Sequence, residues 1–268
     1  MLQLSSIQLC QGCKGLWLGR NEWEALKKRN LHDDLNLMVT AFWQKEAQRE
    51  LRKKRMEVST TSYSPYQDDA TNTLYALLFC DDLSLFRANF QGAIEDPWKV
   101  LFADPKDTAG LEALASNLSE ESRLRILAFN AMGKKAASAH PKELLGVVIE
   151  VGLEEGLDTL AAYKDLRARY INQSGKMIIW ETNAPTVDER IKSLFQDAAR
   201  VVEKIGPWEK ARLPPPTNGL MRMTFLVSDG LYFGQGTMKD LQRDPLGAPV
   251  VNSATELLIE LTSHLTTK

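Results

Sequence analysis

The chain contains little cysteine and little histidine, with three residues of each among 268. Three cysteines in a chain of this length cannot form the disulfide framework of a secreted domain, and their scarcity fits a reducing cytoplasm. The histidines, His32, His140 and His264, lie in unrelated segments and never adopt an H-x-x-x-H spacing. Because they offer no Ser-His-Asp or Cys-His catalytic set, the sequence favours a non-enzymatic protein.

Long hydrophobic runs are absent as well. Apolar stretches such as residues 74–80 and 144–149 are far shorter than the roughly 20 residues that a bilayer span needs. A basic start followed by an apolar core and a cleavage site is not recognised, so no secretory signal is expected. We therefore expect a cytoplasmic protein with no membrane partner.

Neither sign of charge dominates, because the formal net charge is only −2. The charges are nevertheless uneven: residues 1–57 contain eleven Lys or Arg and seven Asp or Glu, whereas residues 58–268 contain 22 and 28. A basic arm therefore precedes an acidic body. Much of the positive charge lies in residues 49–55, which could contact nucleic-acid phosphates. Stabilisation of cations by a helix C-terminus explains the cluster more simply, so nucleic acid is the weaker alternative.

One short motif carries recognisable chemistry. Cys10 and Cys13 form a C-x-x-C pair, which supplies two of the four ligands that a structural zinc ion needs. The remaining cysteine, Cys80, lies far downstream and is expected in the core. A redox pair is the alternative, but no thioredoxin-like strand and helix frame the motif. The sequence therefore favours an incomplete zinc site.

The residues around this pair extend the motif. Residues 10–26, reading C-Q-G-C-K-G-L-W-L-G-R-N-E-W-E-A-L, resemble the second half of a bacterial zinc ribbon of the transcription factor IIB type, in the transcription-factor zinc-finger family. The matching positions after the cysteines are Gly15, Trp17, Leu18, Arg20, Glu22 and Leu26. The resemblance implies zinc bound by Cys10 and Cys13, with a first knuckle about 20 residues upstream, before Met1. Either the chain is a truncated version of a longer gene product, or the ribbon binds metal weakly or not at all.

The periodicity of the sequence predicts three parts. Residues 1–57 form the half zinc ribbon and a basic helical arm, and residues 58–73, polar and interrupted by Pro65, form a linker. Residues 74–268 form the body, helical over 74–139 and a sheet with two helices over 144–268. The expected helices of the first half cover 74–89, 98–102, 107–118 and 119–135.

The second half predicts an α+β fold with an antiparallel sheet. Alternating patterns predict strands over 145–151, 157–163, 167–171, 176–181, 220–228 and 231–233, with part of one face solvated. Capping boxes at Thr186 with Glu189 and at Ser253 with Glu256 predict two helix starts. The apolar face of the strand over 220–228 should pack on the first of these helices. This order of elements resembles that of profilin-like and roadblock-like domains. Sequence segments such as residues 157–163 and 228–234 resemble those of an uncharacterised bacterial protein family.

The body offers no strong catalytic motif. Asp158, Glu181 and Asp229 fall near strand ends, where carboxylates either act as acid and base or simply form turns. Gly234 and Gly236 lack the remaining residues of a phosphate-binding loop. We therefore expect a non-enzymatic protein-interaction or regulatory module with a protein partner, and leave its oligomeric state open. The alternatives are a small-molecule-binding or hydrolytic domain, using the loops from Ser228 to Gly236 with Glu181, and a transcription-linked nucleic-acid binder.

Overall fold

The computed structural model describes residues 63–133, 137, 139–181 and 184–266, together with two short paired strands nearer the N-terminus. These two strands are β1 (Gln8–Leu9) and β2 (Leu16–Trp17). Five helices follow in the described part: α3 (Asp69–Leu77), α4 (Leu83–Asn89), α5 (Trp98–Leu101), α6 (Thr108–Ser116) and α7 (Ser122–Met132). The expected helices over 107–118 and 119–135 are thus present, each slightly shorter than expected.

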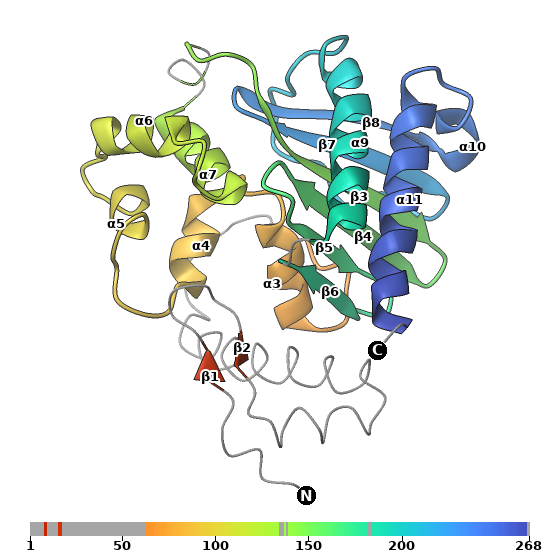
Figure 1. Cartoon of the computed structure of the whole chain (residues 1–268), viewed down its shortest axis with the longest axis horizontal. Coiled ribbons are helices and arrows are strands. Elements are labelled where there is room, and N and C mark those ends of the chain that lie inside the picture. The colour runs from red at the N-terminus through yellow and green to blue at the C-terminus, as the bar shows by residue number, and fades with distance from the viewer. Residues whose placement is uncertain are drawn as a thin grey trace, which may run out of the picture.

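An antiparallel sheet forms the centre of the body (Figure 1). Its strands are β3 (Leu144–Leu153), β4 (Gly156–Tyr163), β5 (Ala168–Ile171), β6 (Met177–Trp180), β7 (Leu220–Val227) and β8 (Gly230–Thr237). They lie in the order β6-β5-β4-β3-β7-β8, and every neighbouring pair is antiparallel. The helices α9 (Pro185–Val202), α10 (Met238–Leu241) and α11 (Gly247–Thr266) complete the body. The α+β class predicted from the sequence is therefore confirmed.

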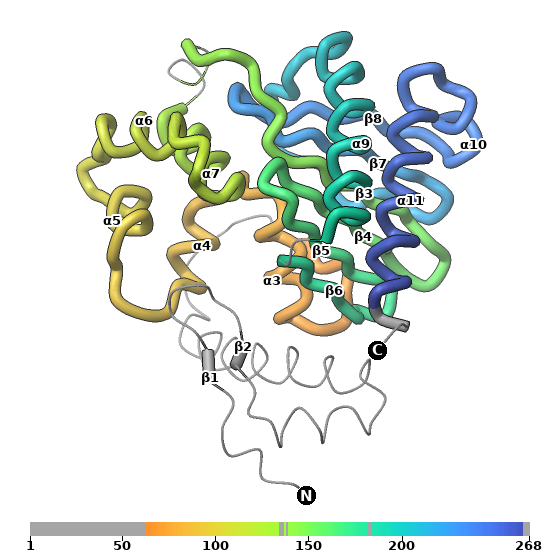
Figure 2. Tube along the Cα trace, viewed as in Figure 1, coloured from red at the N-terminus to blue at the C-terminus, as the bar shows by residue number. Residues whose placement is uncertain are grey.

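Helices cover both faces of the sheet. In Figure 1 α9 and α11 run side by side across one face, and Figure 2 shows the segment from α3 to α7 on the other side of the strands. One core joins α3 to α7 with strand residues such as Leu145, Tyr163 and Leu226. The other joins α9 and α11 with Val147, Leu160 and their neighbours. The expectation of a partly solvated face is wrong for the central strands, because the helical half of the chain packs there.

The apolar face of β7 packs on α9, as predicted. Its residues and those of the helix belong to one buried cluster, which contains Met221, Met223, Phe225, Val227, Ile191, Leu194, Ala198 and Val201. Phe195 lies at the margin of this cluster and is only partly buried. The strand has one apolar face and the helix has one apolar stripe, and burial of both in this core, which also includes α11, removes them from water.

Both predicted capping boxes are wrong. Helix α9 begins at Pro185 with Ala184 as its N-cap, which makes no side-chain bond, so Thr186 lies inside the first turn. Proline suits this position because its fixed φ matches the helix and its missing N–H costs nothing there. Helix α11 begins at Gly247, whose N–H donates to Asp244 Oδ1 at 2.6 Å. Ser253 lies within that helix and donates to Asp197 Oδ2 of α9 at 2.5 Å.

The N-terminal edge of the body also differs from the prediction. The segment expected as the last part of a linker is packed: Tyr66 is 6% exposed, and its hydroxyl lies 3.0 Å from Thr159 Oγ1 of β4. The side-chain amide of Asn72 bonds both backbone groups of Tyr66. Helix α3 already begins at Asp69. From Tyr63 onward the chain belongs to the body, whereas a separate domain over residues 1–57 lies outside the described residues and stays a prediction.

The helix expected over 74–89 is interrupted. Cys80 has φ of 51°, a left-handed conformation that ends the helical path after α3, and Asp82 caps α4 through its bond from the Ser84 N–H. The amide of Asn130 on α7 donates to the Cys80 carbonyl at 2.7 Å and so pairs a backbone group of the break. This break places Asp81 and Asp82 on a corner between two helices.

Candidate functional site

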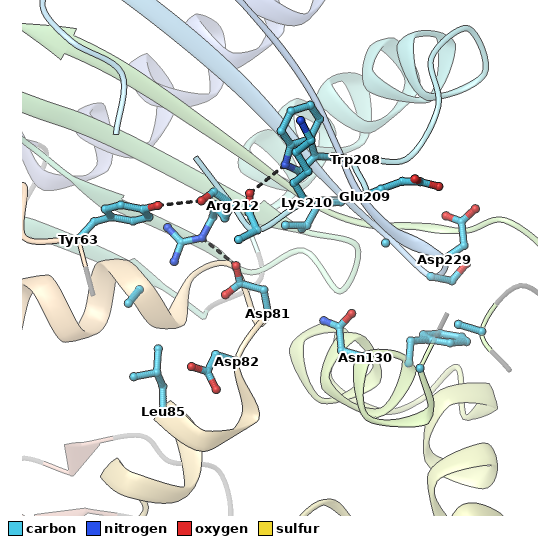
Figure 3. A pocket seen from close by; sticks show the side chains of 18 residues that line it. Tyr63, Asp81, Asp82, Leu85, Asn130, Trp208, Glu209, Lys210, Arg212 and Asp229 are labelled. Carbon is cyan, nitrogen blue, oxygen red and sulfur yellow. Dashed lines mark hydrogen bonds and ion pairs between the residues drawn. The ribbon is translucent and has the colours of Figure 1, made fainter. Parts of the chain in front are cut away.

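A pocket of about 510 Å³ lies between the helical layer formed by α3 to α7 and the end of the sheet at the turn from β7 into β8. We call it the interlayer pocket (Figure 3). Its lining comes from five segments of the chain: Tyr63 before α3, the corner of α3 and α4, helix α7 with the residues after it, the segment before β7, and the turn from β7 into β8. The lining residues are Tyr63, Ala76, Asp81, Asp82, Leu85, Phe129, Asn130, Gly133, Ala137, Trp208–Arg212 and Ser228–Leu231. A cavity of this size is typical of ligand sites.

Arg212 occupies one wall of the interlayer pocket. Its Nε donates to Asp81 Oδ2 at 2.8 Å, and its guanidinium carbon lies 3.9 Å from the centre of the Phe79 ring. The Tyr63 hydroxyl donates to the Arg212 carbonyl at 2.9 Å. Burial opposes the charge, but Asp81 and Tyr75 raise the pKa of Arg212 above its ordinary value. The wall therefore holds a guanidinium between a carboxylate and an aromatic ring.

The segment before β7 forms the next part of the wall. The Trp208 N–H donates to the Leu231 carbonyl at 2.6 Å, which ties the segment to the start of β8. The indole N–H of Trp208 donates to the Ala211 carbonyl at 2.9 Å, and its ring packs edge-on against Phe233. The Lys210 amine lies 5.6 Å from the centre of the indole ring. These bonds hold an otherwise irregular loop in place.

The turn between β7 and β8 brings Asp229 to the pocket. The Tyr232 hydroxyl donates to Asp229 Oδ2 at 2.9 Å, while Oδ1 is buried without a partner among the described residues. Burial and the bond to Asp229 raise the pKa of Tyr232 to about 12, so the hydroxyl remains a donor at neutral pH. Ser228 is not free for chemistry, because its hydroxyl donates to the Pro141 carbonyl at 3.1 Å and accepts from the Glu143 N–H at 3.0 Å.

The charge of the lining is unbalanced. It contains the four carboxylates of Asp81, Asp82, Glu209 and Asp229 but only the two cations of Lys210 and Arg212. Arg212 is already paired with Asp81. Carboxylates in a concave site focus a negative potential, and aromatic rings attract cations through their faces. The arrangement suits a ligand with a positive charge at the end of an apolar stem.

The expected carboxylates do not converge on one site. Asp229 lines the interlayer pocket, but Asp158 and Glu181 are not among its lining residues. Asp158 instead accepts from the Tyr170 hydroxyl at 2.9 Å and from the Gln173 N–H at 2.7 Å, and Glu181 pairs with Arg169. Asp158, on the inner strand β4, and Glu181, which follows the edge strand β6, therefore each stabilise the sheet locally. Sequence reasoning missed Asp81, Trp208 and Arg212, since nothing local in the sequence marks residues that meet only in the folded chain.

A second polar cluster lies inside the body, between α3 and the sheet. Glu150 has no exposed surface; its Oε1 accepts from the Tyr75 hydroxyl at 2.6 Å, and its Oε2 lies 3.8 Å from Arg222 Nη1. Burial raises the pKa of Glu150 above its ordinary value of 4.5, although Tyr75 and Arg222 oppose this shift. Arg222, on the opposite face of β7 from Met221 and Met223, also donates twice to Gln235. Gln235, an exposed residue of the edge strand β8, thus holds the buried Arg222 guanidinium with its side-chain carbonyl.

Cys80 is a core residue, as predicted. Its side chain is fully buried, and burial raises its pKa to about 12. The thiolate that a nucleophile requires is therefore not populated at neutral pH. No group of three or more metal-binding side chains occurs among the described residues.

Cys10 and Cys13 lie outside the described residues, but the strands on either side of them are described. β1 pairs with β2 in antiparallel register, Gln8 with Trp17 and Leu9 with Leu16. Zinc binding by the two cysteines stays a prediction.

Comparison with known proteins adds no relative. No protein-family model, no curated protein and no solved structure matches this chain. Within the part of the chain that the structure describes, no helix has the length and apolar character to cross a bilayer. Any assignment of function therefore depends on the geometry of the site.

Proposed function

We propose that the chain is a non-enzymatic protein-interaction module whose interlayer pocket binds a basic segment of a partner protein. The observation that supports this most directly is the excess of carboxylates over cations in a pocket that also exposes the aromatic rings of Tyr63 and Trp208. Arg212 provides an internal example of the binding mode, since its guanidinium is held by Asp81 and the Phe79 ring. A cytoplasmic location, predicted from the sequence, fits such a role.

The small-molecule-binding or hydrolytic alternative has less support. The residues 228–231 do line the pocket, but Ser228 is engaged in backbone bonds and Glu181 lies elsewhere. The two hydroxyl groups of the lining, those of Ser228 and Tyr63, both donate to backbone carbonyls, which disfavours a hydroxyl nucleophile at this site. Acidic lining also disfavours nucleic acid at this site, because phosphates would be repelled.

A peptide of six arginines, labelled with a fluorophore, tests the proposal, with six citrullines as the neutral control. We expect Asp82→Asn with Glu209→Gln to weaken binding at least about tenfold, which is about 1.4 kcal/mol. Asparagine preserves the cap of α4, so the helix is retained. The matched variant Glu189→Gln with Glu203→Gln removes equal charge from α9 and its end, away from the pocket. Equal loss in the two double variants would show nonspecific attraction and contradict the proposal.

We propose in addition that the C-x-x-C pair of Cys10 and Cys13 contributes two thiolates to a zinc site. Metal analysis of the purified chain should find zinc that is lost on Cys10→Ser, because Cys13 is then the only thiolate of the pair that remains to bind the metal. Stoichiometric zinc that survives this substitution would show that the metal lies elsewhere.

A further inference from the structure

The chain itself carries a segment that fits the interlayer pocket. Five of the seven residues over 49–55 are Lys or Arg, and one is Glu. The lining of the pocket has the opposite excess, four carboxylates against two cations. Charge complementarity of this kind favours association and its rate.

Connectivity brings this segment close to the pocket. Tyr63 lines the pocket, and its hydroxyl bonds the Arg212 carbonyl, so the described chain starts at the pocket wall. Arg55 precedes Tyr63 by eight residues, a distance that an extended chain covers within about 28 Å. For a segment tethered by so short a linker, the effective concentration at the pocket is on the order of millimolar. A free ligand must therefore compete with the basic segment for the pocket.

We propose that the basic segment over residues 49–55 occupies the interlayer pocket of its own chain and must be displaced before a partner binds. The inference rests on the proposed function, because it assigns an internal competitor to the same pocket. Its Lys or Arg side chains take the place that the partner's cations take, near Asp82 and Glu209. Binding of a partner is therefore autoinhibited, and salt weakens both the internal and the external contact.

Cross-linking of the intact chain tests the internal contact directly. A carbodiimide joins an amine to a carboxylate only where the two touch, so Lys53 or Lys54 should be linked to Asp82 or Glu209, as mass spectrometry would show. Mixing ¹⁴N- and ¹⁵N-labelled chains separates links within one chain from links between copies. Links that are mixed in isotope, or that join the pocket to Lys27 and Lys28 equally well, would overturn the proposal.

The six-arginine peptide gives a second and independent readout. The variant Arg52→Gln, Lys53→Gln, Lys54→Gln should bind it at least about tenfold more tightly than the natural chain. The control Lys27→Gln, Lys28→Gln, Arg29→Gln removes the same charge at a greater distance along the chain and should change affinity less than about twofold.

The outcomes separate the two proposals. Peptide binding at the pocket that is equal in the natural chain and in both triple variants would refute autoinhibition and leave the proposed function standing. No binding by the variant with residues 52–54 neutralised would refute the proposed function, and the cross-links would then decide the internal contact alone.

Discussion

At the scale of single residues, Glu150 shows how the body uses charge inside its core. The carboxylate has no exposed surface and depends on Tyr75 and Arg222 for its partners. The alternation of residues in β7 predicts that Arg222 lies on the face opposite the apolar residues, and the structure confirms this. The same alternation does not reveal that a helical layer covers that second face, so the buried pair could not be predicted.

The raised pKa of Glu150 has a consequence for stability. Between pH 4.5 and its folded pKa the native state binds more protons than the unfolded chain, so this residue makes stability fall as pH rises through that window. Glu150→Gln keeps an acceptor for Tyr75 but cannot titrate. We expect the free energy of unfolding of the natural chain, relative to the variant, to decrease as pH rises above 4.5 in urea titrations. Parallel curves from pH 4.5 upward would contradict the prediction.

At the scale of elements, periodicity predicted the type and approximate place of most strands and helices. The strands β3 to β7 follow their alternating patterns, because one apolar face per strand must be buried. The helix starts were wrong at α9 and α11, since Pro185 and Asp244 supply them instead of the expected hydroxyl residues. Several residues near a helix start can each act as its cap, and the sequence alone does not show which of them does so. Helix α10 gave no periodic pattern because it has only four residues.

The contact between β7 and α9 yields a graded prediction. Phe225 is fully buried, whereas Phe195 on α9 is only partly buried. Phe225→Ala should reduce the free energy of unfolding by about 3 to 5 kcal/mol, because a cavity forms in addition to the lost burial. Phe195→Ala should cost less, about 1 to 2 kcal/mol, since solvent already reaches that ring. Equilibrium denaturation of both variants is the measurement, and equal losses would show that Phe195 is buried as deeply as Phe225.

At the scale of the whole molecule, the interlayer pocket illustrates the limit of sequence reasoning. Asp229 was noticed as a turn residue, but Asp81 and Arg212, 131 positions apart, form their ion pair only because α3 packs beside the segment before β7. Contacts of this kind leave no periodic trace in one sequence. The sequence alone shows that residues 1–57 are basic and the rest of the chain is acidic. The structure adds a pocket with an acidic lining, to which this basic segment could bind.

The N-terminal boundary of the body, near Tyr63, can be tested by truncation. The sequence predicts that residues 1–57 are dispensable for folding, and the packing of Tyr66 against Thr159 moves the start of the body to about Tyr63. A chain that begins at residue 59 should therefore unfold cooperatively in urea. A chain that begins at residue 74 loses Tyr66 and residues 69–73 of α3, more than half of that helix, and burial of the aromatic ring alone contributes about 3 to 5 kcal/mol. It should be much less stable or fail to fold. Loss of cooperative unfolding in the chain that begins at residue 59 would show that the basic arm forms part of the core.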